Sequence, residues 1–232
     1  MLKVLKSEER GRTNISWLDS RHSFSFGDYH NSEAMHYSDL RVINEDIIAP
    51  GQGFGMHPHK NMEIVTFVLS GSLIHRDSLG SESVLRPGII QKMSAGKGIL
   101  HSEHNYSNSE PLHLLQIWII PEKSGIAPSY NESEFDYIDN VAHLASPVGQ
   151  SGQVTLNQDA HIYAMRSNNN QKITRSLDES RKYWIQVVKG EEVSINGSKV
   201  SQGDAVQLEN VSSLTYYSEE ASEILMFDLR AM

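Results

Sequence analysis

Apolar residues along this chain recur in short runs that have the character of β-strands. The runs are rich in β-branched, aromatic and large aliphatic side chains, and each is bounded by Gly, Pro, Asn or Ser. Helical periodicity is weak along nearly the whole chain. The pattern predicts an all-β sandwich or barrel. Strands are expected at VTFVLSG (65–71), VLRPG (84–88), LHLLQIWII (112–120), YWIQVVKG (183–190) and ILMFDL (224–229).

Two segments repeat one arrangement of strands and turns. Residues 67–88 contain a strand, Gly71, a second strand, a turn at Leu79-Gly80 and a third strand. Residues 186–204 follow the same course, with Asn196-Gly197 as the turn. Asn-Gly between alternating apolar residues is a strong hairpin signal. Two such copies indicate a duplicated β-barrel, the alternative being the general similarity of any two hairpins.

The stretch between the two copies, residues 121–150, has the composition of a linker. It holds three of the seven prolines together with many Gly, Ser, Asn and Asp residues. We therefore expect two domains that meet near residue 140, an N-terminal domain of residues 1–140 and a C-terminal domain of residues 141–232.

Composition and charge narrow the classes of function. The net charge of −9 and the scattered Lys and Arg residues argue against nucleic-acid binding, which needs clustered cations. The absence of cysteine excludes disulfides, thiolate zinc sites and cysteine nucleophiles. The N-terminus lacks the apolar core of a signal peptide, and no run approaches the ~20 apolar residues of a membrane span. The expected location is the cytoplasm, with neither nucleic acid nor membrane as partner.

Histidines concentrate in the first half of the chain, so a histidine site is expected there. Residues 51–63 read GQGFGMHPHKNME. On a strand, His57 and His59 would point to the same face and could bind one metal ion, and Glu63 has the same parity. A single His-x-His pair is also common as surface decoration in a loop.

A second segment supplies the missing ligands. Residues 94–105 read SAGKGILHSEHN, in which His101 and Glu103 repeat the spacing of two. Gly96 and Gly98 allow a tight turn into this strand. Paired strands carrying the two motifs would give three imidazoles and one carboxylate, with positions left for water or substrate. Such a set suits Fe, Mn, Co, Ni, Cu or Zn.

The remaining histidines are interpreted as structural. His104 has the opposite strand parity to His101, and His113 is expected to be a hydrogen-bonded structural residue. His22, His30, His36 and His75 join this group, although His22 is a candidate for a place near the pocket. Counting along the second copy places Ser176, Asp178 and Tyr216 at the positions of His57, His59 and His101, so no such metal is expected there.

These motifs resemble the cupin superfamily. Gly51, His57, His59 and Glu63 have the spacing of its first motif, and Gly98, His101 and Asn105 have the spacing of its second. The resemblance to the pirin family is closer and covers residues 10–130, with a weaker second cupin after them. It rests on WLDSRHSFSFGDYHN (17–31), LRVINEDIIAPGQGFGMHPHKNMEIVTFVLSG (40–71), HRDSLG (75–80), SAGKGILHSEHN (94–105) and LHLLQIWI (112–119).

The pirin resemblance implies a specific fold and site. The fold would be two tandem cupin barrels of the jelly-roll type, with one metal ion, expected to be Fe(II), in the N-terminal barrel. The ligands carried over are His57, His59, His101 and Glu103. Many cupins use the first-motif glutamate instead, which is Glu63 here, and we expect Glu63 close to the site rather than on the ion.

The resemblance also implies an activity. In its length and its short second domain, the chain resembles members of the bacterial quercetin 2,3-dioxygenase branch of the family. Such an enzyme would open the heterocyclic ring of a flavonol such as quercetin with O2 and release carbon monoxide. The substrate would be a small planar aromatic molecule, and Glu103 would also take its hydroxyl proton.

Two other functions fit the same residues. One is a metal- or redox-sensing regulatory pirin that binds a protein partner without turnover. The other is a different cupin chemistry, with flavonol cleavage as a side activity. The physiological substrate is not encoded in the motif spacing.

Overall fold

The computed structural model describes residues 1–231, and strands dominate it. Apart from a single 3-10 turn at Ser7–Glu9, the described residues contain no helix. Within this part of the chain no helix is long and apolar enough to cross a membrane. The prediction of an all-β protein is confirmed.

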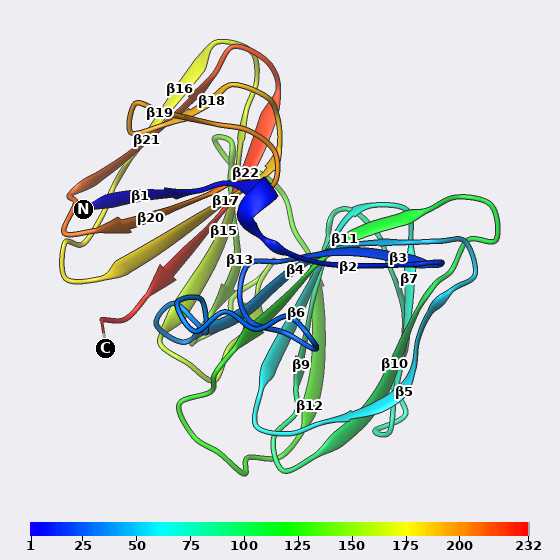
Figure 1. Cartoon of the computed structure of the whole chain (residues 1–232). Helices are drawn as coiled ribbons and strands as arrows, with labels where there is room; N and C mark the ends of the chain where they lie inside the picture. Colours follow the sequence, from blue (N-terminus) through cyan, green and yellow to red (C-terminus); the bar gives the residue numbers. More distant parts are fainter. Residues whose placement is uncertain (232) are drawn as a thin grey trace.

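The first barrel consists of a seven-stranded sheet facing a four-stranded sheet (Figure 1). The larger sheet has the order β12 (Ser129–Glu134), β9 (Ile89–Ser94), β6 (Glu63–Ser70), β11 (Leu112–Ile119), β4 (Leu40–Ile48), β3 (Leu18–His22) and β2 (Gly11–Ile15). The smaller sheet has the order β5 (Gly53–His59), β10 (Ile99–Asn105), β7 (Leu73–Asp77) and β8 (Glu82–Leu85).

The second barrel repeats this order of strands, except that one edge strand of its larger sheet runs parallel to its neighbour, where the first barrel has an antiparallel pair. Its larger sheet has the order β1 (Leu2–Leu5), β20 (Ala205–Glu209), β17 (Lys182–Lys189), β22 (Ser222–Leu229), β15 (Ala160–Ser167), β13 (Val141–Ser146) and β14 (Val154–Thr155). Its smaller sheet has the order β16 (Gln171–Ser176), β21 (Ser213–Ser218), β18 (Val193–Ile195) and β19 (Ser198–Val200). The predicted duplication is therefore confirmed.

The five predicted strands are present as β6, β8, β11, β17 and β22. Asn196 and Gly197 form the two-residue turn between β18 and β19, with φ angles of 48° and 83°. A type I′ hairpin needs positive φ at both positions, which is why Asn-Gly predicts it.

The stretch between the two copies is more ordered than its composition suggests. Residues 121–150 contain β12, which pairs with β9, and β13, which pairs with β15. The interpretation of the whole stretch as a linker is wrong for these strands. β12 (SYNESE) is a mostly exposed edge strand, so it lacks the apolar pattern that would have revealed it. The division near residue 140 stays a prediction.

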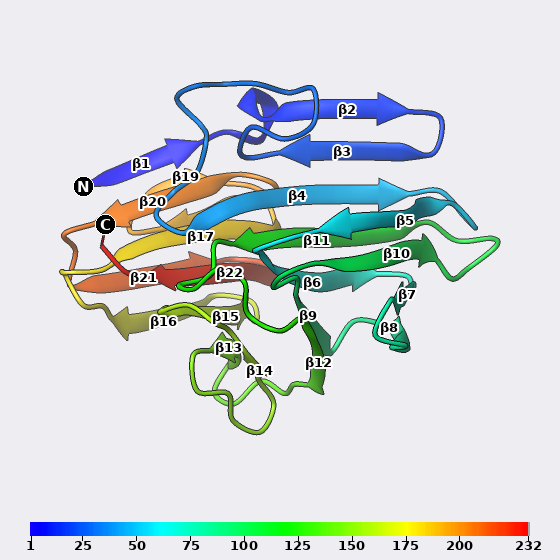
Figure 2. The ribbon, with the colours of Figure 1, turned by 90° about the horizontal axis from the view of Figure 1, so that it is seen from below.

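The first strand of the chain belongs to the second barrel. β1 pairs with β20, Leu2 opposite Leu208, and occupies the edge that β12 occupies in the first barrel. Figure 2 shows β1 beside the strands of the second barrel, with both chain ends at that end of the molecule. The second barrel thus takes one strand from the opposite end of the chain.

The cores of the two barrels differ. One cluster fills the space between the two seven-stranded sheets and includes Ile117, Trp184 and Phe227. A continuous apolar cluster fills the second barrel. The interior of the first barrel instead holds two smaller apolar clusters, around Leu85 and Met93. Polar side chains occupy the space between these two clusters, and they form the candidate site.

Candidate metal centre

His57 and His59 lie on the inner face of β5. The strand alternates as predicted, with Met56 and Pro58 exposed and both histidines half-buried. β5 pairs with β10, and His57 stands directly opposite His101. One ligand atom from each of the three imidazoles lies within 4.8 Å of the others. Ring centroids are 4.4 Å apart for His57 and His101 and 4.7 Å apart for His57 and His59.

Glu103 enters the same barrel interior from β10. A β-bulge lies between His101 and Glu103, and Glu103 stands opposite Phe54. The carboxylate is 4% exposed. Its Oε2 accepts a hydrogen bond from Nε2 of Gln116 at 2.8 Å, and its Oε1 accepts one from Oγ1 of Thr66 at 3.4 Å. These two strand residues fix the carboxylate inside the barrel.

The protonation of the imidazoles favours metal binding. Nδ1 of His57 donates to the carbonyl of Gly55 at 2.7 Å, which leaves Nε2 with a free lone pair. Burial and the neighbouring histidines lower the pKa of His59 to about 4 and that of His101 to about 3. His101 is 1% exposed, and neither of its ring nitrogens has a hydrogen-bond partner. Neutral imidazoles beside a buried carboxylate fit a divalent transition metal.

Glu63 lies on the other face of the sheet. Its neighbours of the same parity on β6, Val65 and Phe67, belong to the cluster between the barrels. Oε2 of Glu63 accepts hydrogen bonds from Ser94 at 2.9 Å and from the side chain of Asn157 at 3.1 Å. The expectation that Glu63 also faces the barrel interior is wrong, because its strand turns Thr66, not Glu63, toward Glu103.

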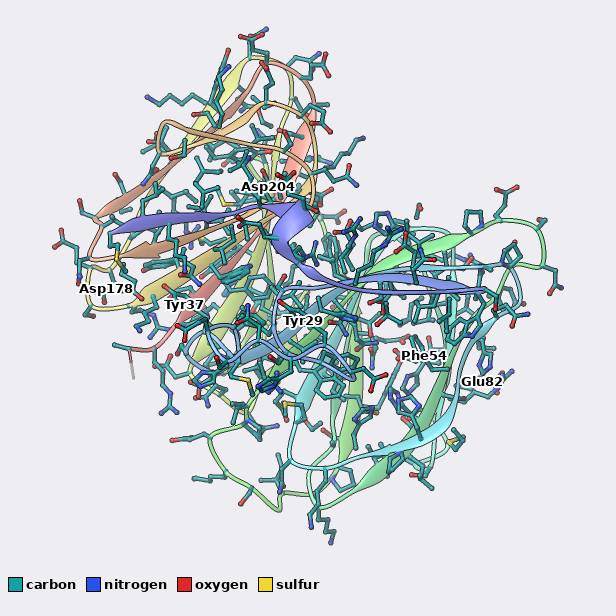
Figure 3. The ribbon with its side chains drawn as sticks, viewed as in Figure 1. Tyr29, Tyr37, Phe54, Glu82, Asp178 and Asp204 are labelled. Atoms are coloured by element: carbon teal, nitrogen blue, oxygen red, sulfur yellow. The ribbon has the colours of Figure 1, made fainter. Side chains whose placement is uncertain are left out.

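A cavity of about 350 Å³ opens in front of the histidines. Apolar side chains supply much of its wall, and Trp118 meets His59 edge-on with ring centroids 4.8 Å apart. Figure 3 places Phe54 in this barrel, apart from Asp178 and Asp204 in the second. The volume suits a small organic ligand. The apolar wall is formed by Leu18, Phe26, Phe54 and Trp118.

Apart from His22 and the four predicted ligands, the polar residues in and around the cavity were not identified by the motif analysis. His22 lines it, as anticipated, and its ring contacts Asn44 at 2.8 Å and Thr13 at 2.9 Å. Asp46 is buried beside them, and burial raises its pKa to about 7. Thr66 and Gln116 interrupt apolar strands, VTFVLSG and LHLLQIWI, and this interruption is a signal that could have identified them.

Two other histidines have clear surroundings. His113 contacts Oε1 of Glu45 at 3.0 Å, which confirms its structural interpretation. His75 is fully buried, and with His101 and Glu103 it forms a second group of possible ligand atoms within 4.8 Å of one another. The interpretation of His75 as a structural residue did not anticipate this group.

The second barrel has different residues at the corresponding place. In its register, Ile173 faces Tyr216 as His57 faces His101, and Arg175 lies two residues further along. The counted equivalents Ser176 and Asp178 do not occupy these places, because Ser176 pairs with Ser213 rather than with Tyr216 and Asp178 lies beyond the end of β16. Tyr216 is buried and its hydroxyl contacts Ser222 at 2.7 Å.

Two tandem barrels with one strand order, the first carrying His-x-His and His-x-Glu on paired strands, define a bicupin. More narrowly, the chain belongs to the pirin family. The model of the Pirin family matches residues 4–119, and that of the quercetinase C-terminal cupin domain matches residues 143–229.

Similar proteins support this assignment along the whole chain. The chain is 44% identical to a quercetin 2,3-dioxygenase of Escherichia coli strain K12 over 229 residues, 99% of each protein. It is 40% identical to a putative quercetin 2,3-dioxygenase of Pasteurella multocida, covering 99% of this chain and all of that protein. The crystal structure of the bacterial pirin YhhW of Escherichia coli in complex with nickel(II) superposes with a TM-score of 0.95 at 43% identity, with all of each chain covered. The prediction of a pirin-family bicupin is confirmed, and the names of these relatives favour the predicted enzyme of the quercetin 2,3-dioxygenase type.

Proposed function

We propose that the chain is a metal-dependent dioxygenase that opens the heterocyclic ring of a flavonol such as quercetin with O2 and releases carbon monoxide. The observation that carries the proposal is that His57, His59, His101 and Glu103 line one cavity with apolar walls, with one ligand atom of each imidazole within 4.8 Å of the others. The names of the full-length relatives support the same reaction. A small planar aromatic substrate and O2 are the expected partners, and the cytoplasm stays the predicted compartment.

We propose His57, His59, His101 and Glu103 as the metal ligands and Fe(II) as the resident ion. The same donors suit Zn, Mn, Co, Ni or Cu, and the similar Escherichia coli pirin was crystallised with nickel(II). When bound, such an ion supplies Lewis-acid and redox chemistry to a substrate hydroxyl and to O2.

The protein's own residues would bind and orient the substrate. Phe54 and Trp118 offer flat apolar surfaces on either side of the histidines, which suits a planar ring. Glu103 would accept the hydroxyl proton of the substrate at Oε1, the oxygen with the longer contact to Thr66. Gln116 would meanwhile hold Oε2, so the carboxylate keeps its orientation.

The test is anaerobic reconstitution with Fe(II), followed by quercetin and O2, with flavonol absorbance and carbon monoxide both recorded. Metal-dependent loss of flavonol with stoichiometric carbon monoxide is expected. Metal-free protein and the variant His101→Ala should give neither. Tight iron binding without loss of flavonol would overturn the proposal, and a search for a protein partner that distinguishes Fe(II) from Fe(III) would follow.

A further inference from the structure

A buried histidine–aspartate pair lies next to His101. His75 is fully buried on β7, and its Nε2 donates to Oδ2 of Asp77 at 3.1 Å. β7 pairs with β10 so that Asp77 stands opposite His101 and His75 stands opposite Glu103. The ring centroids of His75 and His101 are 5.4 Å apart. The pair therefore adjoins the proposed metal ligands on the side of β7.

The turn after β7 holds Asp77 in place. Its Oδ1 accepts hydrogen bonds from the backbone amides of Leu79 at 2.8 Å and Ser81 at 3.1 Å. The other oxygen is thereby aimed at His75. An ionised carboxylate only accepts hydrogen bonds, so Nε2 of His75 carries the hydrogen and Nδ1 is an acceptor.

Nδ1 of His75 is a buried acceptor without a hydrogen-bond partner, as are Oε1 of Gln116 and Oδ1 of Asp46 in the same barrel. Both nitrogens of His101 also lack a partner. One ligand atom each of His75, His101 and Glu103 lies within 4.8 Å of the others. Both oxygens of Glu103 already accept hydrogen bonds from Thr66 and Gln116. Tyr130 packs on the ring of His75 with centroids 4.9 Å apart, which limits its rotation.

The second barrel shows that this fold does not need the pair. The strand equivalent to β7 is β18, whose inward residues Val193 and Ile195 belong to the apolar core. Burying a histidine and a carboxylate costs more than burying two aliphatic side chains. The polar pair is present in the barrel with the histidine cluster and replaced by aliphatic residues in the other, which indicates a role tied to that cluster.

We propose that His75, held by Asp77, is a positioning residue for His101. Nδ1 of His75 accepts the hydrogen of the ring nitrogen of His101 that faces away from the ion, directly or through one water molecule. This contact fixes the tautomer and ring orientation of His101 and leaves its other nitrogen free to bind metal. The inference rests on His101 as a proposed ligand and is independent of the substrate and of the reaction.

Three variants test whether His75, held by Asp77, positions His101. His75→Val imports the residue type of the second barrel and removes the acceptor. His75→Gln keeps an amide hydrogen for Asp77 and an amide oxygen for His101. Asp77→Asn keeps Oδ1 for the turn but turns its amide hydrogens toward His75, so the tautomer of His75 is inverted. The control is His161→Val, which removes a half-buried histidine from the second barrel.

The measurements are the Kd for Co(II), by competition with a chelator, and the absorption spectrum of the Co(II) form. We expect His75→Val and Asp77→Asn to weaken binding about 10- to 100-fold and to change the spectrum, as for other groups that orient metal ligands. His75→Gln and His161→Val should stay near the wild-type values.

An unchanged Kd for Co(II) and an unchanged Co(II) spectrum in both His75→Val and Asp77→Asn would overturn the proposed role of His75. Equal losses in His75→Gln and His75→Val would also overturn it, since packing rather than hydrogen bonding would then be at work. Failure of the wild-type chain to bind Co(II) would instead remove the proposed ligand set. A wild-type protein that binds metal without cleaving flavonol would affect only the proposed reaction.

Discussion

The two barrels of this chain share one strand order and differ in what fills them. In the first, Thr66 stands opposite Gln116 at the fourth pair of β6 and β11, and both bind Glu103. In the second, the fourth pair of β17 and β22 is Ile185 opposite Met226, and both are in the apolar core. The fold is therefore stable with an apolar interior. The polar residues inside the first barrel are therefore not required by the fold, and they lie around the histidine cluster.

The largest effect on activity is expected from Glu103→Gln. The amide has the shape of the carboxylate but is a poor proton acceptor and metal ligand, so turnover of quercetin should fall by about 10²–10⁴-fold. Steady-state kinetics on the Fe(II) form, with the metal content measured alongside, provide the check. Wild-type turnover would remove Glu103 from the proposed mechanism.

The comparison can be tested directly by giving the first barrel the residues of the second. The double variant Thr66→Ile and Gln116→Met leaves Glu103 buried without its two donors. We expect folding to be retained and metal affinity to drop by about 10- to 100-fold. Circular dichroism and calorimetric titration with Ni(II) measure the two quantities. The matched change in the second barrel, Ile185→Leu, should leave affinity unchanged, and equal affinity in all three proteins would contradict the comparison.

The pH dependence of stability should report the burial of His59 in the first barrel. The pKa of His59 is lowered from 6.5 to about 4 in the folded metal-free protein. Between these values the unfolded chain binds the proton and the folded chain does not, so His59 lowers the free energy of unfolding as the pH falls. Denaturant melts of the metal-free protein should therefore lose less stability from pH 7 to pH 4 in His59→Phe than in wild type. Parallel profiles would show that His59 titrates normally.

The smallest effect on metal binding is expected at Glu63, which faces the space between the barrels. Glu63→Gln keeps an oxygen for Ser94 and Asn157, so the Kd for Ni(II) should equal that of wild type. Calorimetric titration tests this against His101→Ala. A loss of metal comparable to that of His101→Ala would contradict the ligand set proposed here and would make Glu63 a ligand.

Local sequence patterns predicted the strands and the grouping of the histidines, because strand formation and the face on which a side chain lies both depend on residue spacing. His57 and His59 share a face since a strand repeats every two residues, and Asn196-Gly197 encodes its own turn. The direction in which Glu63 points was not predictable from spacing. Strand parity shows which residues of β6 share a face, but not which face is turned toward the interior of the barrel. The two edge strands β12 and β1 were not predicted. β12 is polar, and β1 pairs with a strand far along the chain, Leu2 opposite Leu208. His75 and Asp77 became visible only through the register of β7 and β10.

The pairing of β1 with β20 has a consequence for how the molecule assembles. β1 precedes the other described strands, and Leu2 on it pairs with Leu208 on β20, far along the sequence. Such a distant contact closes late, because loop closure must precede it. The strands of the first barrel all lie between Gly11 and Glu134, so its ladders can form while β1 still lacks its partner. The pairing of residues 2–5 with β20 is therefore expected to complete the second barrel after the first.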